Sequence, residues 1–200
     1  MKAKKTGRPR EFDKNEALSA AMHVFWKQGY DGASMRDLTA AMNISGPSLY
    51  GVFGDKRQLF MEAIDFYANR KACKPLEVFE TEPNIETAVQ KFFFEVIEYS
   101  TESVSGAKGC FLSSCVATAA GELEGVEELL KRAILDTDER LARRFELEKA
   151  RGVLPDNFPS KIRARLMFDL RQGLVFRARA GIEPKFLLAD IESNVRIILG

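Results

Sequence analysis

Two short amphipathic segments separated by a helix breaker constrain this chain more than any other feature. Ser34 followed three residues later by Asp37 predicts a helix start, because both side chains satisfy backbone N–H groups of the first turn. Apolar residues then recur at three- and four-residue spacing up to Met42. The stretch Asn-Ile-Ser-Gly-Pro at 43–47 ends this helix and begins another over 47–53. The pattern predicts a helix-turn-helix, whose second helix can lie in the DNA major groove.

The outer face of the second helix is composed mostly of small residues. Leu49, Val52 and Phe53 are the expected inward anchors. Small outer residues let the backbone approach base edges and phosphates, and a tyrosine hydroxyl can reach a phosphate oxygen. Asp55 is expected to cap the next helix, so that its positive N-terminal end faces an anion. The expected DNA-contacting residues here are Arg36, Ser45, Gly46, Pro47, Ser48, Tyr50, Gly51 and Lys56.

Residues 12–67 closely resemble the DNA-binding domain of the TetR family of bacterial regulators. Four segments at fixed spacing carry the resemblance: A-x-x-x-F-x-x-x-G-Y-x-G-x-S from Ala21, D-L-T-x-A-M from Asp37, P-S-L-Y-x-x-F-x-D-K from Pro47 and L-F-x-E-A from Leu59. The rest of the chain matches in length and helical character. The resemblance implies an all-α fold, with an N-terminal three-helix DNA-binding domain and a larger C-terminal domain for ligand binding and dimerisation.

The sequence departs from the resembled family directly after the recognition-helix tyrosine. Much of that family carries an aromatic residue and a histidine there, whereas this chain has Gly51 and Val52. The helix therefore lacks two side chains that could contact DNA. We expect operator readout to depend more on Arg36, Ser48 and the shape of the DNA backbone.

Charge is distributed unevenly along the chain. Residues 1–71 carry a net charge of +4 and the remainder −3, so the basic part coincides with the helix-turn-helix. Residues 1–11 form a basic arm, in which Arg8 and Arg10 are expected to contact phosphates or a minor groove; the alternative is a solubilising tail. We expect a DNA-binding domain over 12–72, with its linking helix from 55, and a ligand-binding and dimerisation domain over 73–200.

Composition excludes several other classes of protein. The chain is 46% apolar and 30% charged, which is typical of a globular protein. We found no secretory signal and no apolar run long enough to cross a membrane, and we expect a cytoplasmic protein. Catalytic and cofactor motifs are missing, so the sequence predicts neither an enzyme nor a cofactor. His23 has no ligands at metal-binding spacing and is expected to pack or face solvent.

The C-terminal part is predicted to be helical over 85–100, 110–121, 126–149, 160–180 and 184–199. Three consecutive phenylalanines at 92–94 point in three directions, so either that helix is buried nearly all round or one side lines a cavity. We expect a pocket for a small apolar or amphipathic effector. Its expected lining is Phe92, Phe93, Val96, Cys110, Phe111, Ser114, Phe145, Phe168 and Gln172.

The last two predicted helices, 160–180 and 184–199, carry apolar residues on two faces. Two such pairs from two chains would form a four-helix bundle, which agrees with the dimerisation implied by the resemblance. The alternative is that the rest of the domain covers both faces. A dimer would place two recognition helices on a double-stranded, pseudo-palindromic operator.

The leading hypothesis is a DNA-binding regulator, in particular a repressor, that a bound effector releases from its operator. A second hypothesis makes Cys110 a sensor thiol, because it lies near a helix N-terminus and Lys108, although a buried structural cysteine is the alternative. Cys110 and Cys115 are five residues apart on one helix and are not expected to pair. A third hypothesis is a helical enzyme or carrier with a vestigial helix-turn-helix.

Overall fold

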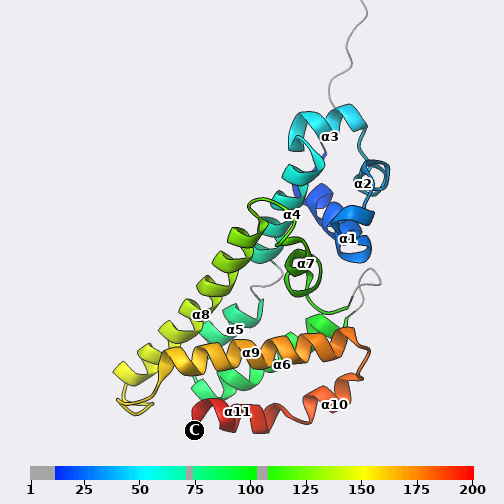
Figure 1. Ribbon diagram of the computed structural model, residues 1–200. Helices are drawn as coiled ribbons and strands as arrows, with labels where there is room; N and C mark the ends of the chain where they lie inside the picture. The colour runs from blue at the N-terminus through cyan, green and yellow to red at the C-terminus, as the bar shows by residue number, and fades with distance from the viewer. Residues whose placement is uncertain (1–11, 71–73, 103–107) are drawn as a thin grey trace, which may run out of the picture.

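The computed structural model describes residues 12–70, 74–102 and 108–200. Regular structure in these ranges is entirely helical, which confirms the expected all-α class (Figure 1). The helices are α1 (Lys14–Gly32), α2 (Met35–Met42), α3 (Gly46–Phe53), α4 (Lys56–Arg70), α5 (Lys74–Thr81), α6 (Ile85–Thr101), the π-helix η1 (Leu112–Val116), α7 (Ala117–Ala119), α8 (Val126–Ala150), α9 (Ser160–Arg179), α10 (Pro184–Leu188) and α11 (Ile191–Leu199).

The N-terminal helices form a small unit at one end of the molecule, where α1 packs against α2 and α4 (Figure 1). Phe25 of α1 and Phe60 of α4 meet edge to face, with ring centroids 4.9 Å apart and no exposure to solvent. Gly29 interrupts the regular geometry of α1, because this glycine adopts φ 76°, and one further turn follows it. The unit holds α3 at the tip of the molecule.

The larger C-terminal domain is built around α6, which packs against α5, α9 and α11. α8 also packs against α9 and extends toward the N-terminal unit, alongside α4 (Figure 1). The core of the C-terminal domain is rich in aromatic rings: Phe79 contacts both Phe92 and Phe145, with ring centroids 6.1 and 5.4 Å apart. No helix in the described ranges has the length and apolar character needed to span a lipid bilayer.

The structure corrects three helix predictions. Residues 74–81, for which the sequence predicts no helix, form α5, because Leu76 and Phe79 at three-residue spacing bury one face of a helix whose early Pro75 is tolerated. The helix expected over 184–199 is divided, and Asp190 begins α11 with its carbonyl accepting from the amide of Asn194. The helix expected over 110–121 starts as the π-helix η1, which contains one extra residue per turn.

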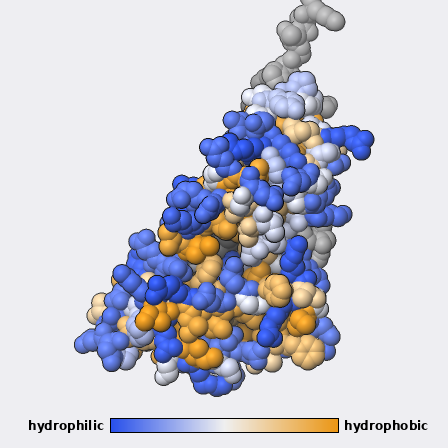
Figure 2. Space-filling model, viewed as in Figure 1, coloured by the Kyte–Doolittle hydropathy of each residue, from blue (hydrophilic) through white to orange (hydrophobic). Residues whose placement is uncertain are grey.

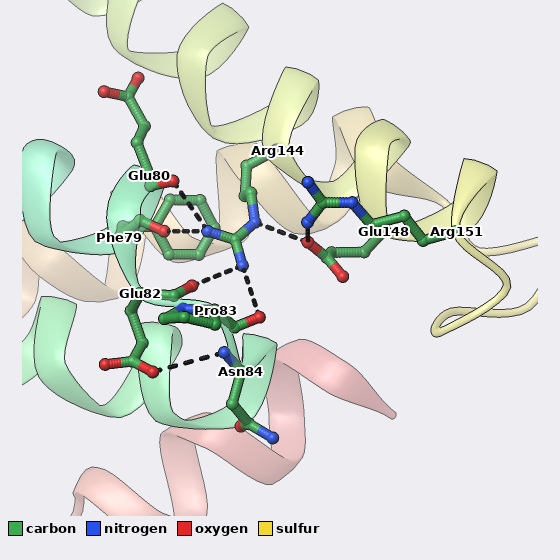
Figure 3. A network of polar contacts seen from close by, with 8 residues as sticks. All are labelled: Phe79, Glu80, Glu82, Pro83, Asn84, Arg144, Glu148 and Arg151. Carbon is green, nitrogen blue, oxygen red and sulfur yellow. Dashed lines mark hydrogen bonds and ion pairs between the residues drawn. The ribbon is translucent and has the colours of Figure 1, made fainter.

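A buried polar network ties α5 to α8 (Figure 3). The Arg144 guanidinium donates to the carbonyl oxygens of Phe79, Glu80, Glu82 and Pro83 at 2.7 to 3.3 Å, and its Nε donates to the carboxylate of Glu148 at 2.9 Å. The carbonyls at the C-terminal end of a helix have no partners within it. Arg144 therefore caps α5 from a neighbouring helix, in place of a local capping residue.

A cluster of aromatic rings joins the two parts of the molecule. Phe111, directly before η1, lies 6.1 Å from Trp26, 6.0 Å from Phe60 and 5.6 Å from Tyr67, measured between ring centroids. All four side chains are buried. η1 is therefore packed against the helices that support the recognition helix.

Candidate DNA interface and effector cavity

The helix-turn-helix forms as the sequence predicts, and each of its caps is identifiable. The Ser34 hydroxyl accepts from the amide of Asp37 and donates to its carboxylate, a reciprocal cap that lowers the pKa of Asp37. Asn43 ends α2 in the left-handed conformation with φ 53°. Ser45 then accepts from the amide of Ser48 and caps α3. These local interactions fix the angle between α2 and α3.

The recognition helix α3 presents Tyr50 to solvent, with 57% of its surface exposed. Leu49 and Phe53 are buried at four-residue spacing and anchor the helix as expected. The expectation that Val52 is a third anchor is wrong, because it is 45% exposed. A helix of eight residues that rests on neighbours along one side buries a single narrow stripe, and Val52 lies beyond its edge.

Other expected DNA-contacting residues are also accessible to solvent. Arg36, Pro47 and Ser48 are exposed, and the Ser45 and Ser48 hydroxyls lie 2.8 Å apart. A Cβ atom added to Gly46 or Gly51 would meet no atom of the protein within 4 Å, so internal packing does not require either glycine. Arg8 and Arg10 lie outside the described residues.

Lys56 lies where α3 turns into α4. Its ammonium is 4.5 Å from the centroid of the Tyr30 ring and donates to the carbonyl of Asp31 at 3.4 Å. The carboxylate of Asp55 accepts from the amide of Gln58 at 2.8 Å, as its capping role predicts. The turn requires Gly54, which has φ 73° and stands where a Cβ would collide with the Gln58 side chain.

A cavity of about 260 Å³ lies in the C-terminal domain. Most of its wall is apolar, with a few polar side chains among the apolar ones. The lining residues are Ala68, Asn69, Leu76, Phe92, Leu112, Ser113, Ala117, Leu130, Ala133, Ile134, Asp136, Thr137, Arg140, Phe168, Arg171 and Gln172. They come from α4, α5, α6, η1, α7, α8 and α9.

Only part of the expected pocket lines this cavity. Phe92, Phe168 and Gln172 lie in its wall. The remaining expected residues do not: Phe93, Val96, Cys110, Phe111, Ser114 and Phe145. Phe111 faces the N-terminal aromatic cluster and Phe145 faces Phe79, so the core already occupies these rings.

Two residues of the cavity wall, Arg140 and Arg171, were not predicted from the sequence. Both lie on helices with many other charged residues, and an arginine on such a helix normally faces solvent. Arg140 is paired with the Glu80 carboxylate through two contacts of 2.7 and 2.6 Å. Arg171 is buried, with 7% of its surface exposed. Position 171 lies within the apolar stripe of α9, which continues before and after it. This placement is the one sequence signal that could have indicated the burial of Arg171.

Cys110 lies beside Arg171 in a buried polar cluster. Tyr67 donates to its sulfur at 3.3 Å, and Nη2 of Arg171 is 3.8 Å from the sulfur and 2.9 Å from the hydroxyl of Tyr99. Burial acts to raise the pKa of the Cys110 thiol, but the Arg171 charge and the Tyr67 and Ser113 groups outweigh it, and the pKa is lowered. The expected influence of Lys108 thus belongs to Arg171 instead. Burial raises the pKa of Cys115 to about 11.

The described ranges contain no cluster of three or more histidine, cysteine or acidic side chains that could hold a metal ion. His23 stacks on Trp26 at 6.3 Å with nearly parallel rings, which agrees with its expected packing role. Cys110 and Cys115 are free thiols.

The fold and the exposed α3 define a helix-turn-helix DNA-binding protein with an additional helical domain. Residues 17–63 match the family model described as bacterial regulatory proteins, tetR family. The TetR family transcriptional regulator CifR, solved as a cysteine mutant complexed with 26bp double-strand operator DNA, is 32% identical with a TM-score of 0.85, covering 94% of this chain and 98% of that one. The chain belongs to the TetR family of transcriptional regulators.

Curated relatives agree with this assignment. The HTH-type transcriptional repressor ComR of Escherichia coli K12 is 29% identical over 195 residues, which is 97% of this chain and 92% of that protein. The reduced form of Escherichia coli NemR shares the fold, with a TM-score of 0.79 at 13% identity over 92% of this chain and 95% of the other. The family model, ComR and CifR describe transcriptional regulators and not enzymes, so the hypothesis of an enzyme with a vestigial helix-turn-helix is not supported.

Proposed function

We propose that this protein is a homodimeric repressor that binds a pseudo-palindromic operator and releases it when a small apolar or amphipathic effector occupies the cavity. The observation that carries the proposal is the position of η1. Leu112 and Ser113 line the cavity, while Cys115 donates to the backbone carbonyl of Phe25 in α1 at 3.2 Å. A ligand that displaces η1 therefore acts on a helix that supports α3.

The DNA contact is assigned to the exposed side of α3 and the residues around it. Tyr50 can donate to a phosphate, and the open surfaces at Gly46 and Gly51 let the DNA backbone come close. CifR was solved with operator DNA, which supports the same mode of binding here. Lys56 and the N-terminal end of α4 add positive potential beside α3.

Replacing Tyr50 or Lys56 with alanine is expected to weaken DNA binding about 5- to 30-fold, the loss of one phosphate contact. The slope of affinity against salt concentration should fall for Lys56→Ala. Fluorescence anisotropy with duplex DNA selected from a random library measures both effects. Lys131→Ala in α8 removes the same charge far along the chain and serves as the control. Wild-type affinity in both α3-region variants would contradict the assignment.

The dimer interface is assigned to α9, α10 and α11. These helices expose Ile162, Phe176, Phe186 and Ile197, at 58, 73, 58 and 48% respectively. Apolar surface gathers over the end of the molecule that they form (Figure 2). An exposed apolar patch of this kind is typical of an interaction surface, and a second copy related by a twofold axis would cover it.

Sedimentation equilibrium is expected to give twice the mass of the 22.5 kDa chain. Phe176→Asp should shift the protein to monomer, because it places a charge at the most exposed aromatic ring of the patch. Leu135→Asp changes a 55% exposed apolar residue of α8 and should leave the dimer intact. A monomeric wild-type protein, or a dimeric Phe176→Asp variant, would refute this interface.

A thiol-based mode of release is the second candidate. It rests on the lowered pKa of Cys110 and on the position of this residue directly before Phe111 and η1. A covalent adduct on the sulfur would add atoms inside the packed region that joins the two parts of the molecule. η1 would then transmit the displacement caused by the adduct to α1.

The two buried thiols should differ in reactivity. At pH 8 iodoacetamide is expected to alkylate Cys110 at least about tenfold faster than Cys115, since only the thiolate reacts and the pKa of Cys115 is about 11. Mass spectrometry of tryptic peptides follows each site. Cys110→Ser should bind operator normally but lose release by electrophiles; unaltered release in that variant would exclude the thiol mode.

A further inference from the structure

Arg171 is a buried cation whose contacts are all with groups that are neutral in their ordinary protonation states. Its guanidinium donates to the amide oxygen of Gln172 at 2.6 Å and to the hydroxyl of Tyr99 at 2.9 Å, and it lies 3.8 Å from the Cys110 sulfur. Among the ion pairs of the described residues, none includes Arg171, and no described group accepts from its Nε. A buried charge without a counter-ion is costly, so this site favours an anion.

The same side chain forms part of the cavity wall. Arg140, the other arginine there, is neutralised by Glu80, so the two residues are not equivalent. Ser113 also lines the cavity, and its hydroxyl oxygen is buried. Asp136 lies on the exposed side of the wall, where solvent screens its charge. The cavity wall thus contains one cation without a counter-ion among the described residues.

We infer that Arg171 anchors the carboxylate of an amphipathic acid, and that this acid is the class of effector that the cavity takes. The role of this acid as an effector rests on the proposed function. The presence of the binding site does not depend on it. A single guanidinium matches a monoanion, and guanidinium–carboxylate bonds are among the strongest polar contacts.

The size and walls of the cavity define the rest of the ligand. A volume of about 260 Å³ equals that of roughly nine water molecules, so the ligand is small. Much of the remaining wall is formed by large apolar side chains: Leu76, Phe92, Leu112, Leu130, Ile134 and Phe168. An unbranched or aromatic acid with a short apolar body would fit both the Arg171 guanidinium and the apolar part of the wall.

The Cys110 sulfur is the competing source of negative charge. If the thiolate neutralised Arg171, the cavity would have no preference for an acid over a neutral molecule of the same shape. Cys110→Ser removes this source and keeps the volume similar. The acid preference should therefore persist or increase in Cys110→Ser.

The test compares three ligands of one shape: octanoate, octanamide and octylamine. Isothermal titration calorimetry on the full-length wild-type protein is expected to show octanoate binding at least about tenfold tighter than octanamide, with octylamine weakest. Trp26, the single tryptophan, lies against Phe111 and gives a second signal by fluorescence. Equal affinity for the acid and the amide would overturn the inference, and this comparison needs no variant.

Variants then locate the anchor. Arg171→Met keeps much of the side-chain length and should reduce the acid-to-amide ratio to about one. Arg177→Met removes an exposed arginine from the same helix and should keep the wild-type ratio. Circular dichroism establishes that each variant is folded. An undiminished ratio in folded Arg171→Met would show that another group holds the acid.

Failure of this inference is distinguishable from failure of the proposed function. If octanoate binds through Arg171 but does not change the affinity for selected operator DNA, the site stands and the effector role falls. If the protein binds DNA and a neutral ligand releases it, the proposed function stands and the acid class is wrong.

Discussion

Replacing Arg144 with methionine is expected to lower the free energy of unfolding by about 3 to 5 kcal/mol. The guanidinium holds four carbonyl oxygens at the end of α5 and the buried carboxylate of Glu148. Methionine fills the space but donates nothing, so these acceptors lose their partner while staying away from water. Urea unfolding followed by circular dichroism measures the change. Arg151 also donates to Glu148 at 2.9 Å, so the buried Glu148 carboxylate would keep one positively charged partner in the variant.

Arg143 provides the matched control for this prediction. It is the preceding residue on α8, its side chain is 62% exposed, and it reaches Glu139 at 3.4 Å. Exposed pairs of this kind contribute little to stability. Arg143→Met should therefore unfold at nearly the wild-type urea concentration. If Arg144→Met were no less stable than Arg143→Met, the network of Figure 3 would not stabilise the fold.

Phe111→Ala is expected to cost about 3 to 5 kcal/mol and also to weaken DNA binding. The ring is fully buried against Trp26, Phe60 and Tyr67, so its removal leaves a cavity between the two parts of the molecule. The packing that holds α1 against the rest of the molecule would loosen as a result. Thermal unfolding gives the stability, and anisotropy with selected operator DNA gives the affinity.

Phe94 is the control for the loss of an aromatic ring. It is 43% exposed on α6, so Phe94→Ala should cost much less and leave the DNA affinity unchanged. The prediction for Phe111 would be contradicted by equal losses in the two variants. It would also be contradicted by a destabilised Phe111→Ala protein that binds DNA like the wild type.

The helix-turn-helix could be predicted in detail because its determinants are local. Ser34, Asp37, Asn43 and Ser45 act on backbone groups within four residues, and all four perform the capping or turn role that the sequence indicates. Val52 was misassigned because the burial of one residue on a short helix depends on which neighbours cover it. That information is not local.

The cavity was predicted less well for the same reason. Aromatic residues at 92, 93, 111 and 145 indicate a large core, but which rings fill it and which border a space depends on how separate helices pack. The helix of Arg171 shows only that this position lies within an apolar stripe, since its burial results from contacts with α6 and the residues before η1. The role of Arg144 likewise required α5, which the sequence did not predict.

The sequence by itself determined the all-α class, the capped helix-turn-helix and the family, because short-range hydrogen bonds and apolar spacing are encoded in neighbouring residues. Tertiary structure alone decided that Arg171 lies buried beside a cavity and that η1 connects this cavity to α1. Side chains far apart in the chain share one space there, and only packing brings them together.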